Sequence, residues 1–202
     1  MAPILTPLSL IIYENSSIIM SALTLDLDGM MAEWRLRAFP EAVNSGCDVM
    51  RFDGIDLDAH LQTRMQAWYD NLIRTAPLEM LAPVDIAARV EVEILSDGTG
   101  WFLLPDDVVR LSCLLLPGWN SPALIIPDGT IPGASLQLSG RQRSDHRTPV
   151  AVVTGRAVRV CSPAPTASPG STVRPLSCHA VTDSPGIYRI DSLALSTIKP
   201  II

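Results

Sequence analysis

Residues 97–119 constrain the fold most, because turn signals alternate there with apolar runs. Asp97-Gly98 favours a tight turn, since Gly accepts positive φ and Asp hydrogen-bonds to its own backbone two residues on. Before it, Val90–Leu95 alternates apolar and acidic residues, as a strand with one wet face does. After it, Trp101–Leu104 carries no charge and is expected to be buried on both faces. The stretch therefore predicts a hairpin in the core of a sheet.

Proline marks the rest of this β-rich part. Pro105 cannot donate to a sheet ladder and Asp106-Asp107 can cap a turn, so the chain is expected to leave the sheet there and re-enter it at Val108. Twelve of the 17 prolines lie from Pro105 onward and separate short β-branched runs. These runs are Leu111–Leu116, Ala123–Ile126, Val150–Val153 and Ala157–Val160. The pattern predicts a small antiparallel β-sandwich or barrel.

Helical spacing dominates the first part of the chain. One apolar stripe, assigned to core packing, consists of Leu57, Leu61, Met65, Trp68 and Leu72. Further helices are predicted over Leu5–Ala22, over Met30–Ala38 with Met31, Trp34 and Ala38 on one side, and over Leu78–Leu81. A terminal helix is predicted from Ile187 to Ile198, with Ile190, Leu193, Ala194 and Ile198 on one side.

These elements predict an α+β fold with an N-terminal α-helical bundle lobe packed on a C-terminal antiparallel β-sandwich or barrel lobe. We place a mainly helical lobe at residues 1–88, a β-rich lobe at 89–186 and a terminal helix or tail at 187–202. The chain has 202 residues, which suffice for one compact unit with two lobes. The hydrophobic fraction of 48% with 18% charged residues is high for a free monomer, so we expect an oligomer.

No apolar run approaches the roughly 20 residues that a membrane-spanning helix needs, so no integral membrane protein is expected. Met1–Tyr13 has no basic region, so no secretory signal is expected either. Residues 1–110 carry 17 acidic and 7 basic side chains, net −10, and residues 111–202 carry 4 and 8, net +4. This split indicates either two unlike faces that stack on different partners or an acidic helical surface alone.

Two acidic stretches contain side chains of the type that bind metal ions. Asp26 and Asp28 resemble part of a calcium loop, but the later ligands of such a loop are missing. Asp53–His60 holds three carboxylates and a His that can bind a divalent ion, but an N-cap role for Asp56 or Asp58, with acidic residues in the first turn of a helix, is the better interpretation. The four cysteines, Cys47, Cys113, Cys161 and Cys178, lack zinc spacing and are expected to be buried free thiols rather than disulfides.

No sequence motif indicates catalysis. The chain has no G-x-S-x-G, P-loop, Rossmann or H-E-x-x-H pattern, and His60, His146 and His179 have unrelated contexts. Cys178 and His179 are adjacent and would point to opposite faces of a strand. We therefore expect no enzyme, no cofactor, and no catalytic or metal-binding residue.

Two polar segments are expected at the surface. Ser139–Arg147 reads as an exposed loop, and its arginines, Arg141, Arg143 and Arg147, can meet phosphate or an acidic neighbouring subunit, or simply stay solvated. Ser162–Gly170, rich in Pro, Ser and Ala, is expected to be a flexible hairpin tip or linker.

One succession of motifs resembles a known family. It comprises Asp97-Gly-x-Gly100, Leu104-Pro-Asp-Asp-x-x-Arg-Leu111, Pro117-Gly-Trp119, Gln137-Leu-x-x-Gly and Arg147-Thr-Pro-Val-Ala151. Over about residues 55–160 this succession resembles the head-to-tail adaptor, or connector ring, proteins of tailed bacteriophages, especially those of phages infecting Bacteroidetes. The order of lobes is also similar to the tail tubular protein A type of adaptor. This chain has Val108 where such proteins usually carry an aromatic residue.

The resemblance implies a structural virion protein without enzymatic activity. Such a subunit is made in the host cytoplasm and assembles in the neck of the virion as one of about twelve copies in a ring. The ring joins the portal protein to tail or further neck proteins, and DNA passes through it transiently and without specific binding during ejection; no membrane is expected as a partner. The acidic lobe would flank the channel and repel DNA phosphates. Arg110 and Asp106 or Asp107 would fix the turn into the central strand.

A rival interpretation is a host-surface or carbohydrate-binding β-sandwich with a helical attachment domain. Exposed aromatic side chains on a shallow face would mark such a module. Only 5% of residues are aromatic, and Trp101 and Trp119 lie in runs expected to be core.

Overall fold

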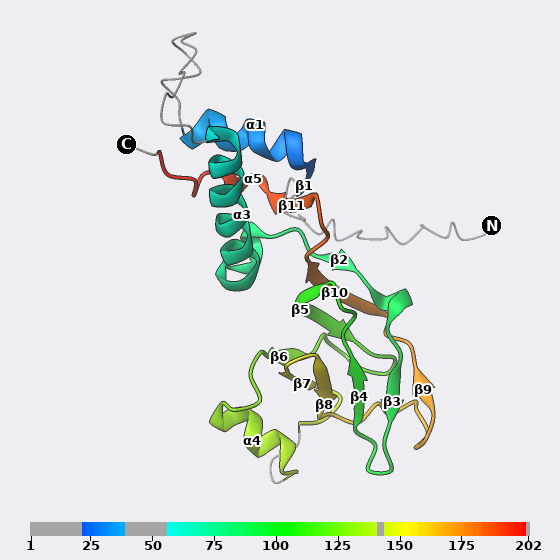
Figure 1. Cartoon of the computed structure of the whole chain (residues 1–202). Helices are drawn as coiled ribbons and strands as arrows, with labels where there is room; N and C mark the ends of the chain where they lie inside the picture. Colours follow the sequence, from blue (N-terminus) through cyan, green and yellow to red (C-terminus); the bar gives the residue numbers. More distant parts are fainter. Residues whose placement is uncertain (1–21, 39–55, 141–143, 201–202) are drawn as a thin grey trace, which may run out of the picture.

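The computed structural model describes residues 22–38, 56–140 and 144–200, and everything below concerns those ranges. The predictions for Leu5–Ser21, Cys47, Asp53, Arg141 and Arg143 lie outside them. The described elements form an α+β fold with two lobes that lie end to end (Figure 1). The predicted fold class is therefore confirmed.

The helical lobe begins with a strand and two helices. These are β1 (Ala22–Asp26), α1 (Leu27–Ala38) and α3 (Leu57–Thr75), followed by the short 3-10 helix η1 (Leu78–Met80). At the start of α3, the Asp56 carboxylate accepts hydrogen bonds from the backbone N–H of Asp58 (3.0 Å) and Ala59 (3.2 Å). This confirms Asp56 as an N-cap, which satisfies donors that the first turn leaves without helical partners.

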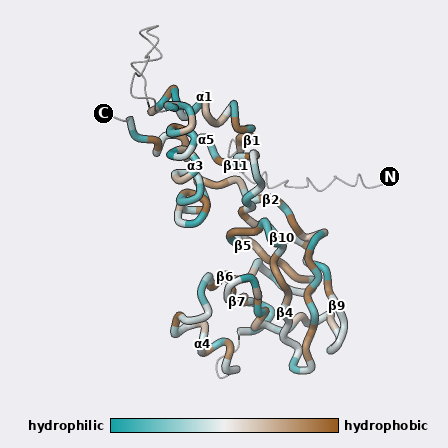
Figure 2. The backbone as a smooth tube through the Cα atoms, in the orientation of Figure 1, coloured by the Kyte–Doolittle hydropathy of each residue, from teal (hydrophilic) through white to brown (hydrophobic). Residues whose placement is uncertain are grey.

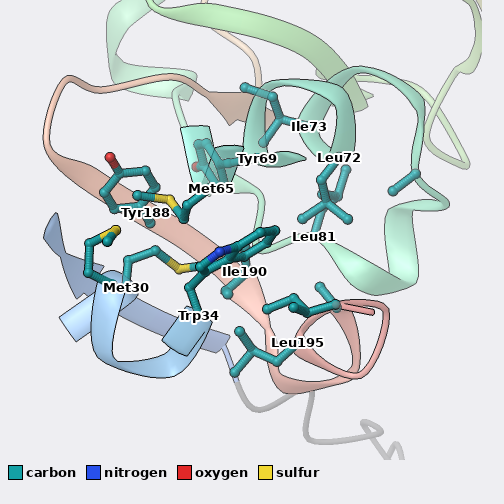
Figure 3. Close-up of a cluster of buried hydrophobic side chains, with 14 of the residues drawn as sticks. Met30, Trp34, Met65, Tyr69, Leu72, Ile73, Leu81, Tyr188, Ile190 and Leu195 are labelled. Carbon is teal, nitrogen blue, oxygen red and sulfur yellow. The ribbon is translucent and has the colours of Figure 1, made fainter. Parts of the chain in front are cut away.

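The apolar stripe of α3 forms the middle of the helical core (Figure 3). Leu61, Met65 and Leu72 are buried as predicted, while Trp68 is half-buried at the edge of the core. Tyr69 and Ile73, which the sequence pattern did not single out, are fully buried instead. The predicted side of α1 is buried too, through Met30, Met31, Trp34 and Ala38.

The C-terminal segment corrects a prediction. Ile187–Asp191 is a strand, β11, antiparallel to β1, and only Ser192–Leu195 forms a helix, α5. The predicted helix from Ile187 is therefore wrong over its first five residues. The segment alternates well enough to bury Tyr188 and Ile190 in the helical core, and the edge of β1 supplies its backbone partners. Residues 187–198 thus complete the first lobe and do not form a separate tail.

The β lobe contains two sheets. The smaller has the order β2 (Val84–Asp85), β10 (Ser177–Thr182) and β5 (Val108–Leu115). The larger has the order β6 (Leu124–Ile126), β7 (Val150–Thr154), β8 (Ala157–Val160), β4 (Gly100–Leu103), β3 (Val92–Ile94) and β9 (Thr172–Val173). The short helices η2 (Ala87–Arg89) and α4 (Pro132–Leu138) complete the lobe. Each predicted β run contains a strand.

All pairings within these two sheets are antiparallel except that of β6 with β7. Helix α4 lies between those two strands in sequence, and a crossover of this kind permits parallel pairing. Side chains from both sheets meet in one core, which includes Leu114 and Cys178 from the small sheet and Phe102 and Val158 from the large one. In Figure 2 the backbone around β5, near the middle of the molecule, is coloured largely as hydrophobic.

The predicted hairpin at Asp97-Gly98 is present between β3 and β4. Leu95 N–H donates to the Thr99 carbonyl (2.7 Å), and Gly98 has φ of +79°. The Asp97 carboxylate accepts a hydrogen bond from Thr99 N–H (3.1 Å), two residues on. The predicted tight turn is therefore confirmed, with a positive φ at Gly98 and a hydrogen bond between the Asp97 side chain and the backbone two residues on.

One face of β4 does not match the prediction. Phe102 and Leu104 are 3% exposed, but Trp101 is 36% and Leu103 58% exposed. The inner face of the strand meets the small sheet, whereas no described element forms such a layer over the outer face. Helix α4 covers the same sheet only near β7, where Ala134 packs against Val150 and Val152. The expectation that Trp101–Leu104 is buried on both faces is wrong.

Ser162–Gly170 also differs from its prediction as a flexible tip. Ser162 is buried, and its hydroxyl accepts a hydrogen bond from Val150 N–H (2.9 Å). The Trp119 indole donates to the Pro163 carbonyl (3.0 Å), and the Thr166 hydroxyl donates to the Pro117 carbonyl (3.2 Å). The segment is thus packed on the β lobe.

Candidate functional site at the lobe junction and the open sheet face

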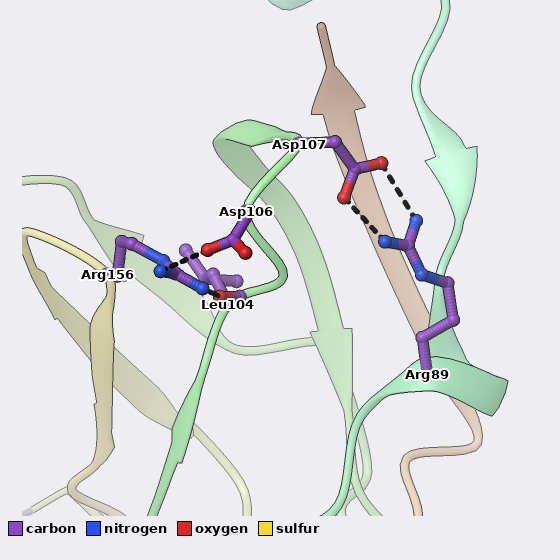
Figure 4. Close-up of polar contacts among 5 residues, drawn as sticks. All are labelled: Arg89, Leu104, Asp106, Asp107 and Arg156. Carbon is purple, nitrogen blue, oxygen red and sulfur yellow. Dashed lines mark hydrogen bonds and ion pairs between the residues drawn. The ribbon is translucent and has the colours of Figure 1, made fainter. Parts of the chain in front are cut away.

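Side chains of the Leu104–Leu111 motif connect three segments, namely the turn before β5, the helix η2 and the turn between β7 and β8 (Figure 4). The Asp107 carboxylate accepts two hydrogen bonds from the Arg89 guanidinium, at 2.9 and 2.5 Å. Asp106 forms an ion pair with Arg156, which also donates to the Leu104 carbonyl (2.7 Å). Arg89 belongs to η2 and Arg156 to the turn between β7 and β8, so the two carboxylates hold the turn before β5 from both sides.

The bidentate bond from Arg89 lowers the pKa of the Asp107 carboxyl and raises that of Arg89 itself. Such charge-assisted pairs are geometrically specific. Sequence reasoning had named Asp106 and Asp107 as structural but missed both arginines. Arg89 lies 18 residues from Asp107, and no local spacing signals that pairing.

Arg110 serves the junction between the lobes, not the turn. Its Nη1 donates to the Ala76 carbonyl (2.6 Å), at the end of α3. Asp183 N–H donates to the Asp107 carbonyl (2.7 Å), where the chain returns to the helical lobe. A hollow of about 180 Å³ lies beside this contact, lined by Leu78, Arg110 and Ile125 among others. The motif therefore fixes how β5 meets the helical lobe.

The acidic stretches considered as metal sites have other partners. Asp26 accepts a hydrogen bond from Gly29 N–H (2.8 Å) in the first turn of α1. Asp58 pairs with Arg35 across two helices (2.6 Å). Within the described ranges, no group of three or more His, Cys, Asp or Glu side chains is arranged to hold a metal ion.

The three histidines lie on separate elements, namely α3, the loop before β7 and β10. Cys178 and His179 point to opposite sides of β10 as expected: Cys178 is fully buried, and burial raises the pKa of its thiol to about 12. The His179 Nδ1 lies 3.0 Å from the Ser177 hydroxyl. Asp85 faces His179 in register, but its carboxylate accepts from Ala87 N–H, which lowers its pKa. This carboxylate orients a turn and not the imidazole.

The cysteine prediction is confirmed for Cys178, which is a buried free thiol, while Cys113 is a half-buried one. In the predicted basic loop, Arg147 is exposed and its backbone N–H donates to the Asp145 carboxylate (2.9 Å). That bond shapes a turn, and contact of Arg147 with phosphate stays a prediction.

The outer face of β4 is the most distinctive open surface of the β lobe. Trp101 lies in register between Glu93 on β3 and Arg159 on β8, and Leu103 lies in register with Ala157. Apolar side chains thus alternate with charges of both signs along the sheet. A mixed surface of this kind, an aromatic anchor with a charged rim, is typical of protein-protein contacts. We call the surface formed by Glu93, Trp101, Leu103, Arg159 and Ala157 the open sheet face.

Charge is not divided between the lobes as it is along the sequence. Among the described residues, the helical lobe (22–38, 56–81 and 183–200) has nine acidic and six basic side chains, net −3. The β lobe (82–140 and 144–182) has eight and six, net −2. The acidic residues from Asp85 to Asp107 belong to the β lobe, and Arg189 and Lys199 return to the helical lobe. The expected contrast between two oppositely charged ends is absent from the described part of the chain.

None of the described helices has both the length and the apolar character needed to cross a bilayer. Comparisons with protein-family models, with curated proteins and with solved structures found no match for this chain.

Proposed function

We propose that this chain is a subunit of a head-to-tail adaptor ring that joins the portal to the tail of a bacteriophage. The proposal begins from the resemblance carried by Leu104–Leu111 and its neighbouring motifs. In this structure the residues of that motif build a junction: Asp106 and Asp107 hold a turn, and Arg110 connects β5 to α3. A rigid joint between two lobes suits a part with a mechanical role.

The observation that carries the proposal furthest is the open sheet face. Leu103 is 58% exposed beside Trp101 on a surface of a chain already rich in apolar residues. Burial of such side chains against a neighbouring copy stabilises an assembly at roughly 25 cal/mol per Å² of apolar surface removed from water. In a ring each copy offers one face to its neighbour and receives a different one, so the contact repeats until the ring closes.

The proposed role of the acidic lobe in flanking the DNA channel has less support. It was motivated by the −10 and +4 split along the sequence, and the described lobes carry −3 and −2 instead. The ring contact does not depend on that charge contrast.

The mass of the particle in solution tests the proposal. Analytical ultracentrifugation of the purified chain, with negative-stain microscopy, should show closed rings. The Leu103→Glu variant should dissociate them, because it places a charge in the contact, while the matched Leu193→Glu variant on α5 should not. Leu193 is similarly exposed, at 50%, but lies in the helical lobe. A monomeric wild-type chain at high concentration, alone and with portal protein, would contradict the ring.

One observation favours the rival binding module. Trp101 is exposed on a sheet face, where a planar side chain can stack on a sugar ring. If the chain is a binding module, the wild-type protein should be monomeric in solution. The Trp101→Ala variant should then lose the binding to a glycan array that the wild type shows. Binding by wild-type monomers would support this alternative over the adaptor.

A further inference from the structure

A groove runs beside α3 in the helical lobe. It consists of two adjoining hollows of about 330 and 450 Å³, which share Trp68 and Thr197 in their walls. Leu72 and Met80 line one hollow, and Trp34 lines the other. We call this surface the α3 groove. Its floor is apolar and aromatic, since the Trp34 and Trp68 rings contact each other at 5.5 Å between centroids, with their planes tilted by 54°.

The rim of the α3 groove is cationic. Arg64 and Lys199 both line the larger hollow, and both are exposed. Neither side chain has an ion pair with another residue in the described ranges.

The sequence before Ala22 has matching chemistry. Residues 1–21 include Leu8, Ile11, Ile18 and Ile19, and Glu14 is their one charged residue. The helical spacing expected there places these apolar residues in one stripe, with Glu14 at its border. Such a stripe requires an apolar surface to cover it. An apolar stripe bordered by one carboxylate complements an apolar groove bordered by two cations.

The attachment point places this segment within reach. Ala22 lies opposite Asp191 in the β1–β11 ribbon. From Asp191 the chain passes directly through α5 to Thr197 and Lys199 in the groove wall.

We propose that the α3 groove is the docking site of the chain's own N-terminal segment, residues 4–19. The apolar stripe lies on Trp68, Leu72 and Met80, and Glu14 faces Arg64 and Lys199. Docking covers the exposed part of Trp68 and shields the tryptophan pair from water. The inference goes beyond the adaptor function and does not depend on it.

Photo-crosslinking in the full-length chain tests this docking. Benzoylphenylalanine replaces Asn71, which lines the groove, and in a matched control it replaces Gln66, which is exposed on the opposite side of α3. After irradiation, peptide mass spectrometry should map crosslinks from position 71 to residues 4–19, and none to that segment from position 66. Crosslinks from position 71 to any other segment, or equal yields at the two positions, would overturn the proposal.

A charge exchange provides a second readout that does not disturb the core. Glu14→Arg should lower the crosslink yield about two- to fivefold, the range expected for an exposed ion pair. Adding Arg64→Glu to the Glu14→Arg chain should restore it. Unchanged yields in both variants would contradict the assigned orientation of the segment. Because particle mass is measured separately, failure of the docking and failure of the ring are distinguishable.

Discussion

Asp107 illustrates what can and cannot be read from single residues. Its place after a proline predicted a turn, and the structure has that turn. The strength of the turn comes from Arg89, which the fold brings from an earlier 3-10 helix. The exposure of Leu103 likewise could not be predicted, because an uncharged strand has the same sequence pattern whether one face or both faces of the sheet are covered. Residue identity predicted local geometry here, but not distant partners.

Replacement of Asp107 by Asn should reduce stability in a pH-dependent way. The folded-state pKa of Asp107 is lowered, so its contribution is present above the unfolded pKa, near 4, and is lost as pH falls through the folded value. Urea unfolding at pH 7 should show a loss of about 1 kcal/mol or less, as expected for a half-exposed bidentate pair. Once the pH is below the lowered folded-state pKa, the variant and wild type should converge.

The control for this measurement is Asp70→Asn, an exposed position on α3 without an ion pair in the described residues. It should stay within about 0.5 kcal/mol of wild type. An Asp107 effect of the same size at both pH values would mean that the amide disturbs packing and that the charge is unimportant.

Among the helices and strands, local sequence patterns correctly predicted the elements that a turn motif or an apolar helical stripe specifies. The hairpin at Asp97-Gly98, a cap at Asp56 or Asp58 and a helix carrying the stripe from Leu57 to Leu72 were predicted from neighbouring residues alone. The failure at Ile187–Asp191 has a different cause. Its residues fit a helix or a strand, and the choice was made by pairing with β1, more than 160 residues earlier. Periodicity cannot weigh a partner so distant in sequence.

The β3–β4 hairpin depends on a glycine after its turn. A Cβ at Gly100 would lie 2.7 Å from Val92 Cγ1 and 3.1 Å from the Glu93 carbonyl oxygen. Gly100→Ala should therefore lower the free energy of unfolding by about 1–3 kcal/mol through overpacking. Chemical denaturation provides the measurement.

Gly133 in α4 is the matched control, because a Cβ there would meet nothing within 4 Å. Gly133→Ala should be neutral or stabilise by up to about 1 kcal/mol, since Ala restricts the unfolded chain. Equal losses in the two variants would refute the packing explanation for Gly100.

At the scale of the whole molecule, the order of the elements along the chain differs from their grouping in space. The last strand and helix return to the first lobe, so Ile190 and Leu195 share a core with Met30 and Met65. This return also explains why charge counted along the chain misjudged the lobes. A count by sequence assigned Arg189 and Lys199 to the wrong one. The composition of the chain does not show that its last strand and helix pack in the first lobe.

Arg110 should govern how strongly the two lobes unfold together. Arg110→Met removes the donor to the Ala76 carbonyl while keeping much of the side-chain bulk. The expected cost is about 1–3 kcal/mol, because the carbonyl loses a charge-assisted partner. Hydrogen exchange measured by mass spectrometry during urea titration should then show α3 opening at lower denaturant than β5 and β10.

Arg74→Met is the control, since Arg74 is exposed on α3 and has no ion pair in the described residues. Its exchange profile should keep α3, β5 and β10 in a single transition. Simultaneous opening of both lobes in Arg110→Met would show that other contacts carry the coupling.

The antiparallel pairing of β11 with β1 determines the order in which the two lobes complete their folding during synthesis. On the ribosome, α1 and α3 emerge before the β lobe, while Tyr188, Ile190 and Leu195, which fill their shared core, are translated after it. The helical lobe therefore completes its core only after the whole β lobe has been synthesised, the reverse of the usual order in which the unit translated first matures first. Until Leu195 has emerged, the methionines and tryptophans of α1 and α3 lack part of their cover and can be bound by a chaperone.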